Sequence, residues 1–169
     1  MALLQEMDQL ESARGIVIRA TRRLASADAR DEALATLKQR RLRGDTFVLV
    51  ERAWRLGVVL LGRSGRLYAT GTTFRIDEPK FDNHQSNLAA ARREYRAAGL
   101  RAGFAPGETV NFDAEPIELD AALAASAGPV ILTPDGVRVR WSPTSTALAP
   151  FDTYLAERVE LLADPPAGA

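Results

Sequence analysis

The chain has 169 residues, of which 46% are hydrophobic and 26% charged, and its formal net charge is zero. These values are typical of one globular domain with a full core, and they exclude a disordered chain, a collagen-like chain and a small disulfide scaffold. Because the sequence contains no cysteine, thiol catalysis, thiolate metal sites and disulfides are excluded as well.

The first residues do not resemble a targeting signal. Acidic residues interrupt the apolar positions of residues 1–14 and no basic stretch precedes them, so no secretory signal is expected. The longest apolar run, residues 57–62, is far shorter than the roughly 20 residues of a membrane-spanning helix. We therefore expect a cytoplasmic protein that does not bind membranes.

Charge is spread unevenly along the chain. Residues 1–44 carry a net charge of +3, residues 45–104 carry +4 and residues 105–169 carry −7. Either the acidic third packs beside the basic two thirds, or the basic part binds an anionic ligand or another protein. The neutral total argues against nucleic-acid binding.

The N-terminal part has helical periodicity, and we expect a helical segment over residues 2–43. A glycine and three β-branched residues follow one another from Gly15 onward and predict a kink or break there. A second helix is expected from Ser26 or Asp28, ending at Gly44. The expected apolar face of the first helix consists of Leu3, Leu4, Met7 and Leu10.

Three strands are expected next. Residues 46–52 alternate between two faces, and residues 54–61 are apolar on both faces, as in a central strand. The glycines and polar residues of 62–65 indicate a turn, after which residues 66–76 return as a third strand. Residues 54–76 are thus predicted to form a long β-hairpin.

The remaining elements alternate between helices and short strands. They are expected at 88–102 (helix), 109–113 (strand), 118–127 (short helix), 129–141 (a hairpin around the turn at 134–136) and 150–163 (helix). Hairpins predict antiparallel pairing. We therefore expect a single α+β domain over residues 1–163, with an antiparallel sheet of about six strands, two β-hairpins and about five helices. A flexible tail is expected at 164–169.

The sequence offers few groups for catalysis. It has no glycine-rich dinucleotide or nucleotide-triphosphate loop and no Gly-x-Ser-x-Gly elbow. His84 is the single histidine, and it can act as a general base or simply hydrogen-bond its neighbours. No metal site and no cofactor are predicted, because a zinc site needs three or four strong ligands. The candidates for catalysis are His84, Ser142 and Thr144, and neither hydroxyl has a visible partner that would activate it.

A second group of residues could bind a small anionic or amino-acid ligand. A polar loop leads into a helix start, where free backbone N–H groups favour negative charge, and arginines follow on that helix. An Asn/Asp pair projects from one face of the strand at 109–113. The alternatives are a solvated helix face and an exposed sheet face. The candidate ligand-binding residues are Asn83, His84, Asn87, Arg92, Arg93, Arg96, Asn111 and Asp113.

Several stretches resemble a family of short bacterial proteins. They read WRLGVVLLG at 54–62, GRLYATG at 65–71, TVNFDA at 109–114, RWSP at 140–143 and YLAER at 154–158. The family is typical of high-GC Gram-positive bacteria and is often labelled glutaminase. The resemblance implies hydrolysis of glutamine to glutamate and ammonia. The Ser-x-x-Lys motif of the serine-dependent glutaminases is absent, because Ala35 and Asp77 precede the two lysines, Lys38 and Lys80, by three residues.

Three functions remain open from the sequence. The first is a binding or regulatory protein without turnover. The second is the glutaminase-like amide hydrolase, and the third is a protein-interaction module that uses the basic segment 45–104. A homodimer is also open, because the Ala-rich helices exceed what one sheet face needs.

Overall fold

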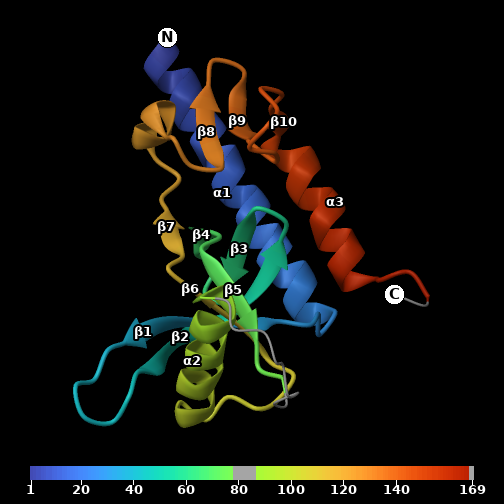
Figure 1. Cartoon of the computed structure of the whole chain (residues 1–169). Helices are drawn as coiled ribbons and strands as arrows, with labels where there is room; N and C mark the ends of the chain where they lie inside the picture. Colours follow the sequence, from blue (N-terminus) through green and yellow to red (C-terminus); the bar gives the residue numbers. More distant parts are fainter. Residues whose placement is uncertain (78–86, 168–169) are drawn as a thin grey trace. The chain divides into compact units, whose positions relative to one another are not determined.

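The computed structural model describes residues 1–77 and 87–167 (Figure 1). The described part contains three α-helices, one short 3₁₀ helix and ten strands in two sheets. The helices are α1 (Ala2–Ser26), α2 (Asn87–Arg101), η1 (Ala121–Ala125) and α3 (Phe151–Ala163). The strands are β1 (Glu32–Lys38), β2 (Thr46–Leu56), β3 (Val59–Gly62), β4 (Leu67–Ala69), β5 (Thr72–Arg75), β6 (Thr109–Phe112), β7 (Glu115–Ile117), β8 (Val130–Thr133), β9 (Gly136–Val139) and β10 (Ala149–Pro150).

The α+β class is confirmed, but the expected purely antiparallel sheet is wrong. One sheet has the strand order β5-β6-β1-β2-β3-β4-β7, and the other has the order β10-β9-β8. Strand β1 pairs antiparallel with β2 but parallel with β6, because the chain passes through β2 to β5 and α2 before it returns beside β1. The numbers of strands and helices also differ from the predicted six and five.

The chain divides into two compact units, and β2 contributes to both. Unit 1 comprises residues 1–31, 54–69 and 115–169, and unit 2 comprises 32–53 and 70–114. In unit 1, α1 packs against α3 and β9. In unit 2, α2 packs against β5. None of the helices in the described part is long and apolar enough to span a membrane.

Helix α1 is continuous, so the predicted break near Gly15 is wrong. Its buried stripe, which includes Val17, repeats every three or four residues straight through the predicted break and faces the core of unit 1. Burial along this stripe outweighs the low helix propensity of one glycine and its β-branched neighbours. Only the last residue of the predicted N-terminal face, Leu10, is buried. The exposed members of that face are Leu3, Leu4 and Met7.

The predicted second helix is also wrong, because residues 32–38 form β1. Its sequence, EALATLK, consists mostly of good helix formers. Ladder partners on both sides, β2 and β6, satisfy its backbone groups and bury Ala33 and Ala35. Tertiary pairing therefore overrides local propensity here.

The predicted strand 54–61 is in fact two strands joined by a tight turn. Gly57 has a φ of +67°, in the left-handed region that glycine adopts readily, and it reverses the chain between β2 and β3. The hydroxyl of Tyr154 on α3 closes this turn. It donates a hydrogen bond to the carbonyl oxygen of Leu56 (3.2 Å) and accepts one from the backbone N–H of Val58 (3.0 Å).

The remaining predicted turns, strands and helices are confirmed in part. The turn at 62–65 joins β3 to β4, with the Gly65 N–H donating to the Gly62 carbonyl at 2.9 Å. The chain does not continue as one strand to residue 76, because β4 ends at Ala69 and β5 begins at Thr72. The hairpin of β8 and β9 and the helix after Pro150 form as expected. The short helix expected at 118–127 is reduced to the 3₁₀ turn η1.

The core of unit 2 is an aromatic cluster beneath α2. Four rings, those of Phe47, Phe74, Tyr95 and Phe112, lie with centroids 4.9–6.0 Å apart. They are tilted or edge-on to one another, as aromatic pairs prefer. This cluster fixes which face of β6 is turned to α2, because Phe112 and its neighbour at two-residue spacing, Val110, are both buried in it.

Candidate functional site

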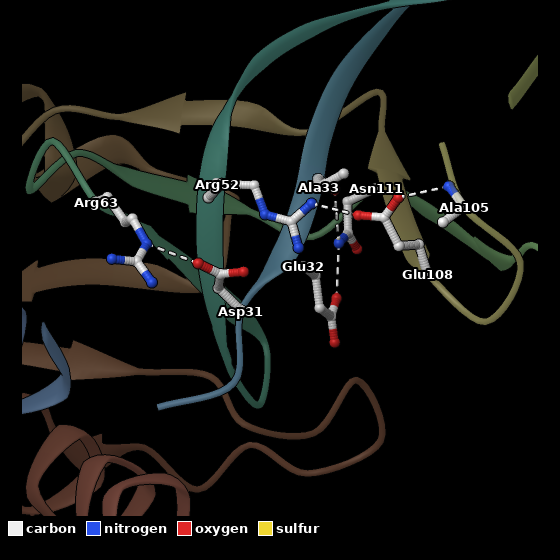
Figure 2. Close-up of polar contacts among 8 residues, drawn as sticks. All are labelled: Asp31, Glu32, Ala33, Arg52, Arg63, Ala105, Glu108 and Asn111. Atoms are coloured by element: carbon white, nitrogen blue, oxygen red, sulfur yellow. Dashed lines mark hydrogen bonds and ion pairs between the residues drawn. The ribbon is translucent and has the colours of Figure 1, made fainter. Parts of the chain in front are cut away.

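Asn111 lies at the centre of a buried polar network in unit 2 (Figure 2). Its side chain is 0% exposed. Its amide nitrogen donates to a carboxylate oxygen of Glu32 at 2.7 Å and to the Ala33 carbonyl at 3.3 Å. Its amide oxygen accepts a hydrogen bond from the Thr73 hydroxyl at 2.8 Å. The amide on β6 therefore connects both neighbouring strands, because it bonds to Thr73 of β5 on one side and to Glu32 and Ala33 of β1 on the other.

A second polar pair of unit 2, Arg52 and Glu108, lies on the face of the sheet opposite to the Asn111 side chain. Arg52 is in register with Ala33, which is itself in register with Val110 of the apolar face. The Arg52 guanidinium donates to a carboxylate oxygen of Glu108 at 2.7 Å, and the other oxygen accepts from the Ala105 N–H at 2.8 Å (Figure 2). Glu108 thus holds the loop before β6 against β2.

Unit 1 has an ion pair beside its buried tryptophan. Arg63 donates to the Asp31 carboxylate at 2.6 Å (Figure 2). Its guanidinium carbon lies 5.1 Å from the centroid of the Trp54 ring. The indole N–H of Trp54 donates to the Ala29 carbonyl at 3.0 Å. These contacts fix the chain segment that connects α1 to β1.

The predicted arginines lie on α2, but they do not meet Asn111. Arg92 and Arg93 are exposed, and Arg96 approaches the Asp77 carboxylate at 4.0 Å. Because α2 covers the Phe112 face of β6, Asn111 on the alternate face points away from this helix. The structure therefore does not bring Arg92, Arg93 or Arg96 together with Asn111.

The other predicted residues are also dispersed. Asp113 is exposed and lies just after β6, with a φ of +54°. Ser142 and Thr144 face each other with their hydroxyl oxygens 3.0 Å apart, in a loop of unit 1. Asn87 begins α2. The predictions for Asn83 and His84 lie outside the described residues.

Unit 1 contains a groove of about 580 Å³ between α1 and α3. Arg23 crosses it and donates two hydrogen bonds of 3.0 Å to the Glu160 carboxylate. These bonds hold the pKa of Glu160 below its usual value and raise the pKa of Arg23, while partial desolvation opposes both shifts. Two of the charged groups that line the groove thus bind each other, and this contact links α1 to α3.

Strand β2 exposes apolar side chains in unit 2, a feature that the sequence pattern did not indicate. Val48, Leu49 and Val50 of β2 are exposed by 51%, 49% and 53%. Strand β3 has four residues after a tight turn, so it reaches back along β2 only as far as Ala53. In the described part of the chain, residues 46–50 of β2 therefore have a ladder partner on one side only, β1. We call residues 46–50 the β2 edge.

A basic hairpin tip adjoins the β2 edge. The loop between β1 and β2 begins after Lys38 and carries Arg40, Arg41 and Arg43. Arg101 of α2 adds a fifth cation, because its guanidinium donates to the Asp45 carbonyl at 2.8 Å. Within the described residues, no carboxylate forms an ion pair with any of the five side chains. We call these five residues the basic tip.

No family model matches the chain, and searches of curated proteins and of solved structures found no match either. Among the described residues there is no cluster of three or more carboxylate or imidazole side chains that could hold a metal ion. The β2 edge with its basic tip is the described surface that combines exposed backbone, apolar side chains and uncompensated charge.

Proposed function

We propose that this chain is a binding protein without turnover, and that it docks extended polypeptide segments along the β2 edge. The observation that supports this proposal most directly is the run of three exposed apolar residues, 48–50, on a strand with one open side. Such an edge presents unpaired N–H and C=O groups that another extended chain can pair with.

The side chains of the edge provide the selectivity that backbone pairing lacks. Val48 and Val50 alternate with Leu49, so an added strand would meet apolar contacts beside its backbone hydrogen bonds. Val50 has no opposite residue on β1, because Leu34 pairs with Glu51 and Ala35 with Leu49. This bulge bends the strand locally and restricts pairing to a short segment.

A random 12-residue peptide library displayed on phage tests this proposal. The full chain is the bait, and each enriched clone is retested on V48K/V50K, which places two charges on the edge. The control variant, L88K/L100K, changes two exposed leucines of α2 in the same unit. We expect clones that lose binding to V48K/V50K by at least about tenfold and retain binding to the control.

Two results would overturn the proposal. One is the absence of enriched clones, and the other is a set of clones that bind both variants equally. Circular dichroism establishes that the variants are folded, and V48T/V50T removes apolar surface while keeping residues that favour strands. Clones that depend on the edge should also weaken on V48T/V50T.

The glutaminase-like activity is the alternative proposal, and it rests on the family resemblance alone. Two of its three candidates, Ser142 and Thr144, contact each other in a loop of unit 1, and the third, His84, lies outside the described residues. Ammonia release from L-glutamine by the full chain, against a heat-inactivated control, separates the two proposals. The binding proposal predicts no release, whereas release that is lost in S142A would establish the hydrolase. Residence in the cytoplasm is part of the binding proposal.

A further inference from the structure

We infer that the segment that docks on the β2 edge is an acidic one: a short extended peptide of another protein with apolar residues next to a block of carboxylates. This inference rests on the proposed function and adds the chemistry of the partner. The observation behind it is the position of the basic tip at one end of an open, apolar strand edge.

None of the cations of the basic tip forms an ion pair with a carboxylate of the described residues, although Arg101 donates to the Asp45 carbonyl. Lys38, Arg41 and Arg43 are exposed, and no described carboxylate forms an ion pair with them. The Nε atom of Arg40 is buried, and no atom of the described residues accepts a hydrogen bond from it. Like charges held close together repel one another, so an anionic partner would relieve this repulsion as well as add attraction.

The edge and the tip lie within reach of one peptide. Arg43 precedes Val48 by five residues, and a strand rises about 3.3 Å per residue. A segment of about eight to ten residues therefore covers Val50 at one end and the tip at the other. Its apolar part would add to β2 while its carboxylates lie beside the arginines.

The same features argue against two other occupants. A second copy of this chain would bring a second β2 edge with its own basic tip. Charged residues and a bulge, both present here, are features that keep one strand edge from pairing with another copy of itself. A nucleic acid would match the arginines, but its phosphates gain nothing from three exposed aliphatic side chains. An acidic, partly apolar peptide uses both parts of the surface.

Fluorescein-labelled peptides of defined sequence test the inference on the full chain. The probe is an alternating Thr-Val hexamer joined to four glutamates, with the acidic block at the C-terminus in one peptide and at the N-terminus in another. Matched peptides carry four serines or four lysines instead. A further version is N-methylated at alternate residues of the hexamer, which blocks backbone pairing and leaves the charges unchanged.

We expect one of the glutamate peptides to bind at least about tenfold more tightly than its serine counterpart at low ionic strength, because several exposed ion pairs form at once. The lysine peptide should bind most weakly, and the preference should shrink with added salt. R41E/R43E should abolish the preference. The control R92E/R93E makes the same change of charge on the exposed face of α2 and should keep it.

The outcomes separate the inference from the proposed function. Equal binding of the glutamate and serine peptides, abolished by N-methylation, overturns the acidic partner and leaves the docking edge intact. Glutamate peptides that bind equally well when N-methylated overturn both. A single-stranded DNA 12-mer that binds more tightly than the glutamate peptides and requires Arg41 and Arg43 also overturns the inference. So does a wild-type dimer that V48K/V50K converts to a monomer in sedimentation.

Discussion

Replacing Gly57 by alanine should destabilise unit 1 by much more than the backbone conformation alone explains. Gly57 has a φ of +67°, and a Cβ atom there would overlap the hydroxyl oxygen of Tyr154 and lie 3.1 Å from its Cζ. That hydroxyl is buried and forms two hydrogen bonds to the turn. The substitution therefore combines strain with the loss of a hydrogen-bonded contact.

The expected magnitude follows from these two terms. Left-handed backbone strains an alanine by about 1–2 kcal/mol. Displacing the Tyr154 hydroxyl removes two hydrogen bonds, each of which contributes about 1 kcal/mol. We expect Gly57→Ala to lower the free energy of unfolding by about 3–4 kcal/mol. Gly65→Ala is the matched control, because Gly65 has a φ of +86° but its nearest neighbour, the Thr21 hydroxyl, is 3.8 Å from the added Cβ. It should lose only the strain term.

Urea unfolding followed by tryptophan fluorescence measures these differences. Both tryptophans belong to unit 1, where Trp54 is fully buried and Trp141 is exposed, so a Trp141→Phe background leaves the buried ring as the single reporter of this unit. Tyr154→Phe completes the cycle. Without the hydroxyl, Gly57→Ala should cost about 1–2 kcal/mol, which gives a coupling of about 2 kcal/mol between the two sites.

Two results would refute this reasoning. The first is a Gly57→Ala effect no larger than that of Gly65→Ala, which would mean that the Tyr154 hydroxyl does not close the turn. The second is strict additivity of Gly57→Ala and Tyr154→Phe. Either result would assign the cost to backbone conformation alone.

Three further substitutions probe the polar and aromatic contacts. Asn111→Asp should destabilise unit 2 more at pH 7 than at pH 4, because it places a second carboxylate beside Glu32 and protonation of either relieves the repulsion; a pH-independent effect in urea unfolding would contradict this. Glu160→Gln should lower stability at neutral pH, where the salt bridge to Arg23 keeps the glutamate charged. The difference from the wild type should vanish as the pH falls from the ordinary pKa of 4.5 through the lower folded pKa, and its persistence in acid would refute the pairing. Phe112→Ala should lower the free energy of unfolding by about 3–5 kcal/mol, whereas Phe112→Leu should lower it much less. Thermal unfolding followed by near-ultraviolet circular dichroism measures both, and similar losses would argue against the ring cluster.

Elements with a strong local signal were predictable from the sequence. The last helix has a buried stripe at helical spacing, and the hairpin of β8 and β9 has its turn at the Pro-Asp-Gly sequence. In both cases the residues that determine the structure are neighbours in sequence. The pattern over 109–112 likewise placed Val110 and Phe112 on one face and Asn111 on the other.

The errors occurred where distant segments decide the structure. Strand β1 has the composition of a helix, and only its two ladder partners make it a strand. Gly57 lies in an apolar run that reads as one central strand, and the turn is recognisable only once Tyr154 is known to close it. Long-range pairing is information that a local pattern does not contain.

Which of the described candidate residues lie together was not predictable for a related reason. The arginines of α2 and Asn111 were each identified as polar groups on a regular element. Whether they meet depends on which face of β6 the helix covers. The ring of Phe112 packs against Tyr95 of α2, so the helix covers the face opposite to Asn111. Asn111 consequently satisfies its amide within the sheet, with Glu32 and Thr73.

The β2 edge shows the converse case, in which an apolar pattern does not imply burial. Alternating aliphatic residues predict a strand with a buried face, and β2 does bury Phe47 in the aromatic cluster. The next three residues, 48–50, are also aliphatic but about half exposed, and they lie beyond the part of β2 that the short strand β3 reaches. Burial is a property of the neighbours and not of the strand itself. An apolar strand left open beside uncompensated arginines is therefore better explained by a partner that supplies both a strand and negative charge than by packing within this chain.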